Sequence, residues 1–129
     1  VRVSIVGVTV SPTNPQGRAW DLVGGEADPV VVTASVPLHR EIDRTPVSQD
    51  HNNASWNRWL PGVYDAALDL PLRFTVFDDD ATSREEIGSA DLDARALPAT
   101  AGEFAIPVRA AGTLGQQTGA LRLRIEDVP

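Results

Sequence analysis

The residues most able to do chemistry in this chain are the acidic side chains that follow an apolar segment in its second half. Asp78, Asp79 and Asp80 are consecutive, and Glu85 and Glu86 follow after a short polar stretch. Two carboxylates about 4 Å apart repel each other by about 4 kcal/mol at an effective dielectric constant near 20. A loop relieves that repulsion either by directing the side chains into water or by holding a hard cation between them. These residues alone leave both interpretations open.

The acidic composition excludes several classes of partner. The chain carries a formal charge of −7 and has a pI near 4.6. Sequence-independent binding to nucleic acid requires a basic surface. Unaided binding to an anionic membrane relies on basic residues that contribute only about 1 kcal/mol each. We therefore expect no binding to nucleic acid, and contact with phosphate or anionic lipid only through a bound cation.

Length and composition also indicate the domain organisation. The chain has 129 residues, enough for a single domain with its own hydrophobic core. It has no cysteine, which excludes disulfides and thiolate metal sites, and no methionine even at position 1. No apolar run is long enough to span a membrane, and no signal-peptide pattern is present. We expect one domain over residues 1–129, excised from a longer protein, monomeric in isolation and of unknown compartment.

Short apolar segments separated by glycine and proline predict an all-β fold. Many segments are rich in β-branched residues or alternate between apolar and polar side chains. No long segment has a helical period, although a short helix over residues 63–68 is an alternative. The pattern predicts an eight-stranded antiparallel β-sandwich. The expected strands cover residues 1–10, with a bulge near Val6 and Gly7, and residues 29–37, 40–47, 55–60, 70–77, 87–92, 103–108 and 120–126.

The direction of these strands places acidic segments together. If the strands alternate in direction, the first, third and fifth connections emerge at the same end of the sandwich. The first connection holds Asp21 and Asp28, and the fifth holds Asp78, Asp80 and Glu85. Five carboxylates facing one another favour the bound cation over the solvated loop, because their mutual repulsion increases.

Four motifs along the chain resemble one known family. Residues 25–32 look like a motif of glycine, two residues and Ser-Asp-Pro-Tyr-Val, and residues 53–57 look like Asn-Pro-x-Trp-Asn. Residues 77–88 hold an Asp-x-Asp loop whose last acid lies three residues before a glycine, and residues 119–125 look like a closing strand. Together these motifs resemble the C2-domain family, the calcium-dependent phospholipid-binding module of protein kinase C, synaptotagmin and phospholipase C. The resemblance implies a Greek-key sandwich with the phospholipase-type strand order.

The resemblance also implies a site for one or two Ca²⁺ ions. Oxygen ligands in tolerant geometry suit calcium, whereas zinc and copper prefer His or Cys, and both histidines lie outside the two acidic connections. Because the fifth connection is one residue shorter than is usual in the family, Glu86 is an alternative to Glu85. The implied ligands are the carboxylates of Asp21, Asp28, Asp78, Asp80 and Glu85 and the backbone carbonyls of Trp20 and Asp79.

Two functions follow from this resemblance. The first is a calcium-binding module that associates with anionic phospholipid membranes in a calcium-dependent manner, with Leu22 and Val23 reaching the bilayer interface. The alternative is a calcium-stabilised structural or protein-interaction domain attached to an enzyme or larger protein, without lipid binding, in which Leu22 and Val23 pack against their own loop. The chain shows no arrangement of nucleophile and base, so we expect no catalysis by this domain.

Overall fold

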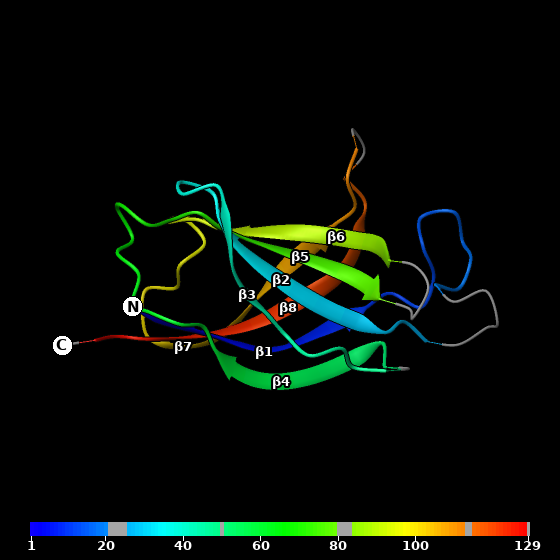
Figure 1. Ribbon diagram of the computed structural model, residues 1–129, viewed down its shortest axis with the longest axis horizontal. Helices are drawn as coiled ribbons and strands as arrows, with labels where there is room; N and C mark the ends of the chain where they lie inside the picture. The colour runs from blue at the N-terminus through cyan, green and yellow to red at the C-terminus, as the bar shows by residue number, and fades with distance from the viewer. Residues whose placement is uncertain (21–25, 50, 80–83, 113–114, 129) are drawn as a thin grey trace.

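The computed structural model describes residues 1–20, 26–49, 51–79, 84–112 and 115–128, and these contain eight β-strands (Figure 1). The described part of the chain contains no helix that could cross a membrane. The strands are β1 (Arg2–Val10), β2 (Pro29–Ser35), β3 (Arg40–Arg44), β4 (Asn53–Trp59), β5 (Leu72–Asp79), β6 (Arg84–Leu92), β7 (Gly102–Arg109) and β8 (Gln117–Glu126).

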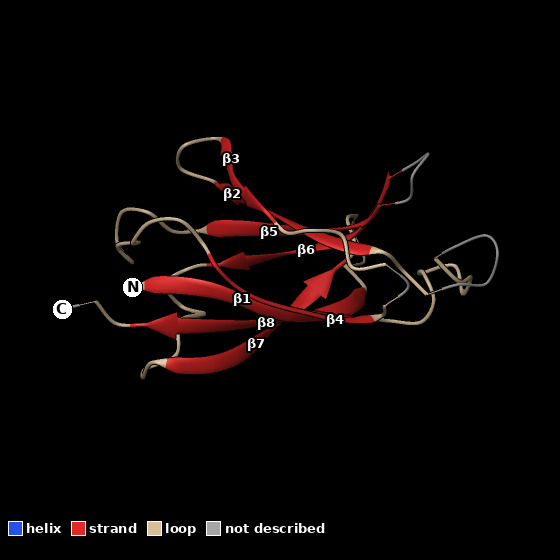
Figure 2. Cartoon of the chain, turned by 60° about the horizontal axis from the view of Figure 1, so that its bottom comes forward, coloured by secondary structure: helices blue, strands red, loops and turns tan. Residues whose placement is uncertain are grey.

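The strands form one sheet that curls into two facing layers. All neighbouring strands are antiparallel, in the order β3-β2-β5-β6-β7-β8-β1-β4. Strands β6 and β7 share a single residue pair, Ser89 with Arg109, so the sheet divides there into two four-stranded layers (Figure 2). The predicted eight-stranded antiparallel sandwich is confirmed. Strand β1 precedes the first long connection, as the phospholipase-type order requires.

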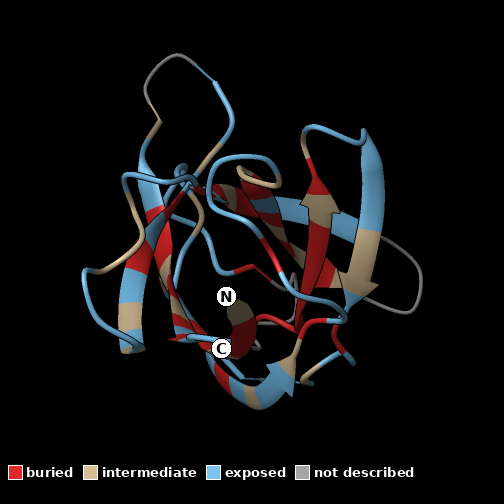
Figure 3. Cartoon of the chain, turned by 90° about the vertical axis from the view of Figure 1, so that its left-hand side faces the viewer, coloured by how far each residue is buried: buried red, intermediate tan, exposed pale blue. Residues whose placement is uncertain are grey.

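The hydrophobic core lies between the two layers (Figure 3). Strand β5 shows how the alternation in the sequence builds it: Leu72, Phe74 and Val76 are fully buried, whereas Arg73 and Thr75 point to the other face and remain more exposed. Burying each large apolar side chain contributes about 1.5–3 kcal/mol relative to leaving it in water. The core of inward-facing residues therefore determines which face of each strand is turned inward.

Several strand limits differ from those expected. Strands β5 and β6 extend toward each other as far as the pair Asp79 and Arg84, because backbone pairing continues into residues whose charge suggested a loop. The guanidinium of Arg84 also lies 3.7 Å from the centre of the Phe77 ring, which favours this extension. The alternative helix over residues 63–68 is wrong: the segment is irregular up to a turn, in which the carbonyl of Asp65 accepts hydrogen bonds from the backbone of Leu68 and Asp69.

An ion pair joins the two outer edges of the curled sheet. Strands β3 and β4 are the terminal strands of the sheet order, one in each layer. Arg58 of β4 donates two hydrogen bonds to the carboxylate of Asp43 on β3, at 2.9 and 3.0 Å. The indole of Trp56 donates to the backbone carbonyl of Pro46 at 3.0 Å. These contacts connect the layers on the side where no backbone ladder does.

The bulge expected near Val6 and Gly7 is confirmed and requires a glycine. Strand β1 shifts register against both neighbours between Ile5 and Gly7. A Cβ at Gly7 would lie 2.2 Å from the carbonyl oxygen of Ala54 and 2.4 Å from a guanidinium nitrogen of Arg122. We therefore predict that Gly7→Ala lowers the free energy of unfolding by about 1–3 kcal/mol, measured by urea denaturation.

The exposed Ser55 lies opposite Gly7 on β4 and provides the matched control. Ser55→Ala should change the free energy of unfolding by less than about 0.5 kcal/mol. Equal stabilities for the two variants would contradict this account of the bulge.

Tyr64 is the single tyrosine of the chain, and its titration reports on one end of the sandwich. Its hydroxyl donates to the carbonyl of Pro61, and burial, followed by the nearby charges of Asp43 and Asp69, raises the pKa of Tyr64 above 10.0. The folded state therefore keeps this proton to higher pH than the unfolded chain does. We predict that the associated stability is complete below pH 10 and falls as the pH rises through the pKa of the folded protein.

Phenolate absorbance measured against pH, in the native and the urea-unfolded protein, tests this expectation directly. Tyr64→Phe should abolish the absorbance change in both states. Coincident titration curves for the folded and unfolded protein would contradict the predicted shift.

Candidate metal site

Strand direction brings the odd-numbered connections to one end of the sandwich. The antiparallel order makes successive strands alternate in direction, so the connections β1–β2, β3–β4 and β5–β6 emerge together, opposite the two chain ends (Figure 1). The positions inferred from strand parity are confirmed for the described residues of these connections. Four residues assigned to the site or to membrane contact, Asp21, Leu22, Val23 and Asp80, lie outside the described residues.

Asp28 and Asp78 meet at this end of the β2–β5 ladder. Pro29 pairs with Asp78, which places Asp28 just beyond the start of β2. The backbone N–H of Asp28 donates to Oδ1 of Asp78 at 2.8 Å, and the backbone N–H of Asp79 donates to the carbonyl of Asp28 at 3.0 Å. Asp28 is 8% exposed and Asp78 is 2% exposed. Asp28 and Asp78, distant in sequence, are thus joined by a backbone-to-carboxylate hydrogen bond, and both residues are largely shielded from water.

The register of β5 and β6 distinguishes the two glutamates. Glu85 is directly opposite Asp78, whereas Glu86 is opposite Phe77. Directly opposite residues of an antiparallel pair project from the same face, and successive residues alternate between faces. Glu86 accordingly lines a surface hollow together with Arg73. The register therefore favours Glu85 over Glu86 as a partner of Asp78.

The same alternation separates the consecutive aspartates. Asp79 follows Asp78 on β5 and pairs with Arg84, so its side chain belongs to the opposite face of the ladder. The pKa of Arg44 is raised, first by its hydrogen bond to Glu41 and to a smaller extent by the charge of Asp79. The carboxylate of Asp79 therefore acts on the outer face, while its backbone remains beside Asp28.

Trp20 anchors the β1–β2 connection to the core, and its ring is buried rather than exposed on the surface. The side chain is 6% exposed, and its indole N–H donates to the backbone carbonyl of Ser11 at 2.7 Å. The ring therefore packs with the core cluster. This position holds the backbone of Trp20 near the acidic end, next to the residues that the structure leaves undescribed.

Asn52 fixes the position of the first connection, a role that sequence reasoning missed. Its side-chain oxygen accepts a hydrogen bond from the backbone of Ala27 at 2.9 Å, and its carbonyl accepts one from the backbone of Val10 at 2.6 Å. Val10 ends β1 and Ala27 precedes Asp28, so one residue holds both ends of the β1–β2 connection. The neighbouring backbone N–H of His51 also donates to the carbonyl of Ala27, at 2.9 Å. The sequence motif pointed to residues 53–57 instead, and only the position of Asn52 in a connecting loop hinted at such a role.

The oxygen atoms of the acidic residues at this end suit a hard cation, but the described residues alone do not form a complete coordination site. Asp28 and Asp78 are brought together, and Glu85 occupies the adjacent register position. Within the described residues, no three Asp, Glu, His or Cys side chains are grouped closely enough to hold a metal ion. Carboxylate and carbonyl oxygens match the preference of calcium rather than that of zinc.

Comparison with known proteins identifies the family and the fold. A protein-family model described as "C2 domain" matches residues 5–109. A C2 domain of plant Extended Synaptotagmin 1 superposes with a TM-score of 0.71 at 24% identity, covering 95% of this chain and 88% of that one. Human GIVD cytosolic phospholipase A2, in complex with methyl gamma-linolenyl fluorophosphonate, superposes with a TM-score of 0.69 at 14% identity, and the match covers 95% of this chain but 16% of that one.

A third similar structure is that of two C2 domains of Extended-Synaptotagmin 2, described as calcium bound. It superposes with a TM-score of 0.62 at 18% identity, covering 95% of this chain and 43% of that one. At these identities the likeness to solved structures shows the fold. A comparison with curated proteins found no match.

The two hydrogen bonds that Asn52 accepts from Val10 and Ala27, here called the Asn52 clamp, lead to a prediction about the β1–β2 connection. Asn52→Ala removes the acceptor of the Ala27 N–H, so this amide should exchange with deuterium at least about tenfold faster, which corresponds to about 1.4 kcal/mol. Asn52→Asp keeps an acceptor oxygen and should restore most of the protection. Amide exchange measured residue by residue by NMR checks both.

The adjacent Asn53 serves as the control, because its side-chain oxygen accepts hydrogen bonds from Thr9 and Arg122 on the outer face instead. Asn53→Ala should leave the exchange of Ala27 unchanged. Unaltered exchange in Asn52→Ala would show that the β1–β2 connection closes without this clamp.

Proposed function

The chain belongs to the C2 domain family, and we propose that it is a calcium-binding module that associates with anionic phospholipid membranes when calcium is bound. C2 domains are a non-catalytic type of module that generally binds membranes or lipids. The observation that carries the calcium proposal is the contact of Asp28 with Asp78. Both acidic residues are buried at the end of one ladder, burial of a charge is costly unless it is compensated, and a divalent cation bound by their carboxylates would compensate it.

The proposed ligands come from two connections. Asp28, Asp78 and Glu85 are supported by the ladder registers that place them side by side or opposite one another. Asp21 and Asp80 are proposed from the family motif, as are the backbone carbonyls of Trp20 and Asp79. The N–H of Asp28 already holds one oxygen of Asp78, so this carboxylate is oriented before any ion binds.

Charge explains why membrane association would depend on calcium. The chain has a net charge of −7, so an anionic bilayer repels it. Bound calcium would supply positive charge and coordination positions for lipid phosphate oxygens. The acidic residues would then hold the protein at the bilayer, with Leu22 and Val23 of the first connection entering the interface.

A protein-interaction role is the second candidate, and exposed apolar residues favour it. Leu38, Val63 and Leu68 are 61%, 57% and 75% exposed, and all three belong to connections at the end opposite the acidic residues. The chain has arginines but no lysine, and among the described residues five arginines form ion pairs with carboxylates. In this role, calcium would stiffen the acidic end without recruiting lipid.

Isothermal titration calorimetry with calcium tests the proposed metal site. We expect Asp78→Asn and Asp80→Asn to weaken calcium binding at least tenfold, because each removes a proposed ligand charge. Asp79→Asn should bind calcium within about twofold of the wild type, because its carboxylate lies on the other face. No heat with the wild-type protein at millimolar calcium, or equal losses in all three variants, would refute the proposed site.

Co-sedimentation with vesicles of phosphatidylserine and phosphatidylcholine tests the membrane step. The protein should pellet with calcium and remain in solution with a chelator, and Leu22→Ala with Val23→Ala should reduce pelleting. Leu38→Ala with Val63→Ala removes exposed apolar groups at the other end and is the matched control. Calcium binding without pelleting would favour the protein-interaction role.

A further inference from the structure

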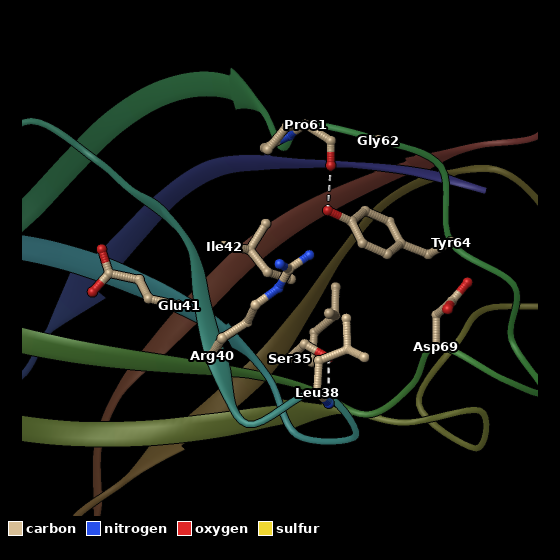
Figure 4. Close-up of a pocket in the computed structure, with 10 residues that line it drawn as sticks. Ser35, Leu38, Arg40, Glu41, Ile42, Pro61, Gly62, Tyr64 and Asp69 are labelled. Atoms are coloured by element: carbon tan, nitrogen blue, oxygen red, sulfur yellow. Dashed lines mark hydrogen bonds between the residues drawn. The ribbon is translucent and has the colours of Figure 1, made fainter.

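A cavity lies at the end of the sandwich opposite the acidic connections. Its volume is about 470 Å³, and it opens between the β2–β3 turn, the start of β3 and the β4–β5 connection (Figure 4). Pockets that bury small molecules have volumes of about 300–1,000 Å³. The cavity shares no residue with the proposed calcium site.

Apolar groups form most of the cavity wall. Leu72 is fully buried at its base, Ile42 packs against the hydrophobic core, and Leu38 at the mouth is 61% exposed. The hydroxyl of Tyr64 is occupied by the carbonyl of Pro61, so the ring presents an apolar surface (Figure 4). A hydrocarbon group entering the cavity would therefore be shielded from water on several sides.

The cavity also contains a buried hydroxyl that can donate a hydrogen bond. Ser35 ends β2 and is 4% exposed. Its Oγ accepts a hydrogen bond from the backbone of Leu38 at 3.1 Å, which leaves the hydroxyl hydrogen without an acceptor among the described residues. Buried polar hydrogens normally have an acceptor. An acceptor oxygen on a bound molecule would satisfy this one.

Arg40 supplies the positive charge of the cavity, which Glu41 and Asp69 also line. It is paired with Ser35 across the β2–β3 ladder, so the two side chains project from the same face. Its guanidinium has no carboxylate partner among the described residues, whereas the neighbouring Arg44 bonds Glu41 at 3.0 Å. In Figure 4 Glu41 points away from Arg40, which rises past Ile42 toward Tyr64.

We propose that this cavity binds a small carboxylic acid with an apolar body. The carboxylate would pair with Arg40 and accept from the hydroxyl of Ser35, and the hydrocarbon would contact Leu38, Ile42 and Leu72. A singly charged carboxylate fits better than a phosphate of charge near −2. Asp69 also lines the cavity, and the chain as a whole carries a charge of −7, so a second negative charge is repelled.

Octanoate is the probe, added to the calcium-free protein in the presence of a chelator so that the result is independent of the proposed metal site. Two-dimensional amide NMR should show saturable shifts at residues 35–42 and 62–64. Octanol and octylamine, which have the same hydrocarbon chain, should bind at least about tenfold more weakly because they lack the anion. Octyl phosphate should also bind more weakly than octanoate.

Arg40→Gln should weaken octanoate binding at least about tenfold and reduce the preference for octanoate over octanol. Arg18→Gln changes an exposed arginine at the other end of the molecule and should bind octanoate normally. The proposal is overturned if millimolar octanoate causes no saturable shifts, if octanol binds equally well, or if Arg40→Gln binds octanoate like the wild type.

Discussion

The ladder between β2 and β5 is the constraint on which the acidic end of this protein depends. Its register pairs Val31 with Val76 and Thr33 with Phe74, so the core residues of both strands face inward together. A shift of one residue would turn every one of these side chains to the other face. The same register leaves Asp28 and Asp78 at the end of the ladder, in hydrogen-bond contact. Burial of the core thus holds together two acidic residues that are distant in the sequence.

The two ends of the sandwich have different chemistry because strand direction alternates. Connections that emerge at one end carry the acidic residues and the clamp formed by Asn52. Connections at the other end carry exposed apolar side chains, Tyr64 and the cavity beside Arg40. One fold therefore separates a charged surface that suits a cation from a partly apolar surface that suits an amphipathic molecule.

The layers are held at their open sides by few contacts. Between β6 and β7 the backbone ladder is reduced to one residue pair, supplemented by a hydrogen bond from Thr118 of β8 to the carbonyl of Ile87 on β6. Across the other opening, the pair of Asp43 and Arg58 joins β3 to β4. The carboxylate of Asp43 is largely buried, with 11% of its side chain exposed, whereas Arg58 is 44% exposed. Such partly shielded, doubly hydrogen-bonded pairs are stronger than ordinary surface pairs. The inner faces supply most of the stability, and these contacts set how the layers meet.

The amino-acid sequence by itself determined the strand content, the bulge at Gly7 and the end at which the acidic connections emerge, because alternation and β-branching are local properties of neighbouring residues. It also pointed to the family through motifs whose spacing is visible in the chain. Only the tertiary structure supplies the register that favours Glu85 over Glu86, since that register sets which residue of β6 faces Asp78. The role of Asn52 was likewise decided by hydrogen bonds to residues 25 and 42 positions away, which local patterns do not encode. The cavity beside Arg40 depends on how the β4–β5 connection packs over β2 and β3, and such packing between distant segments is decided only when the chain folds.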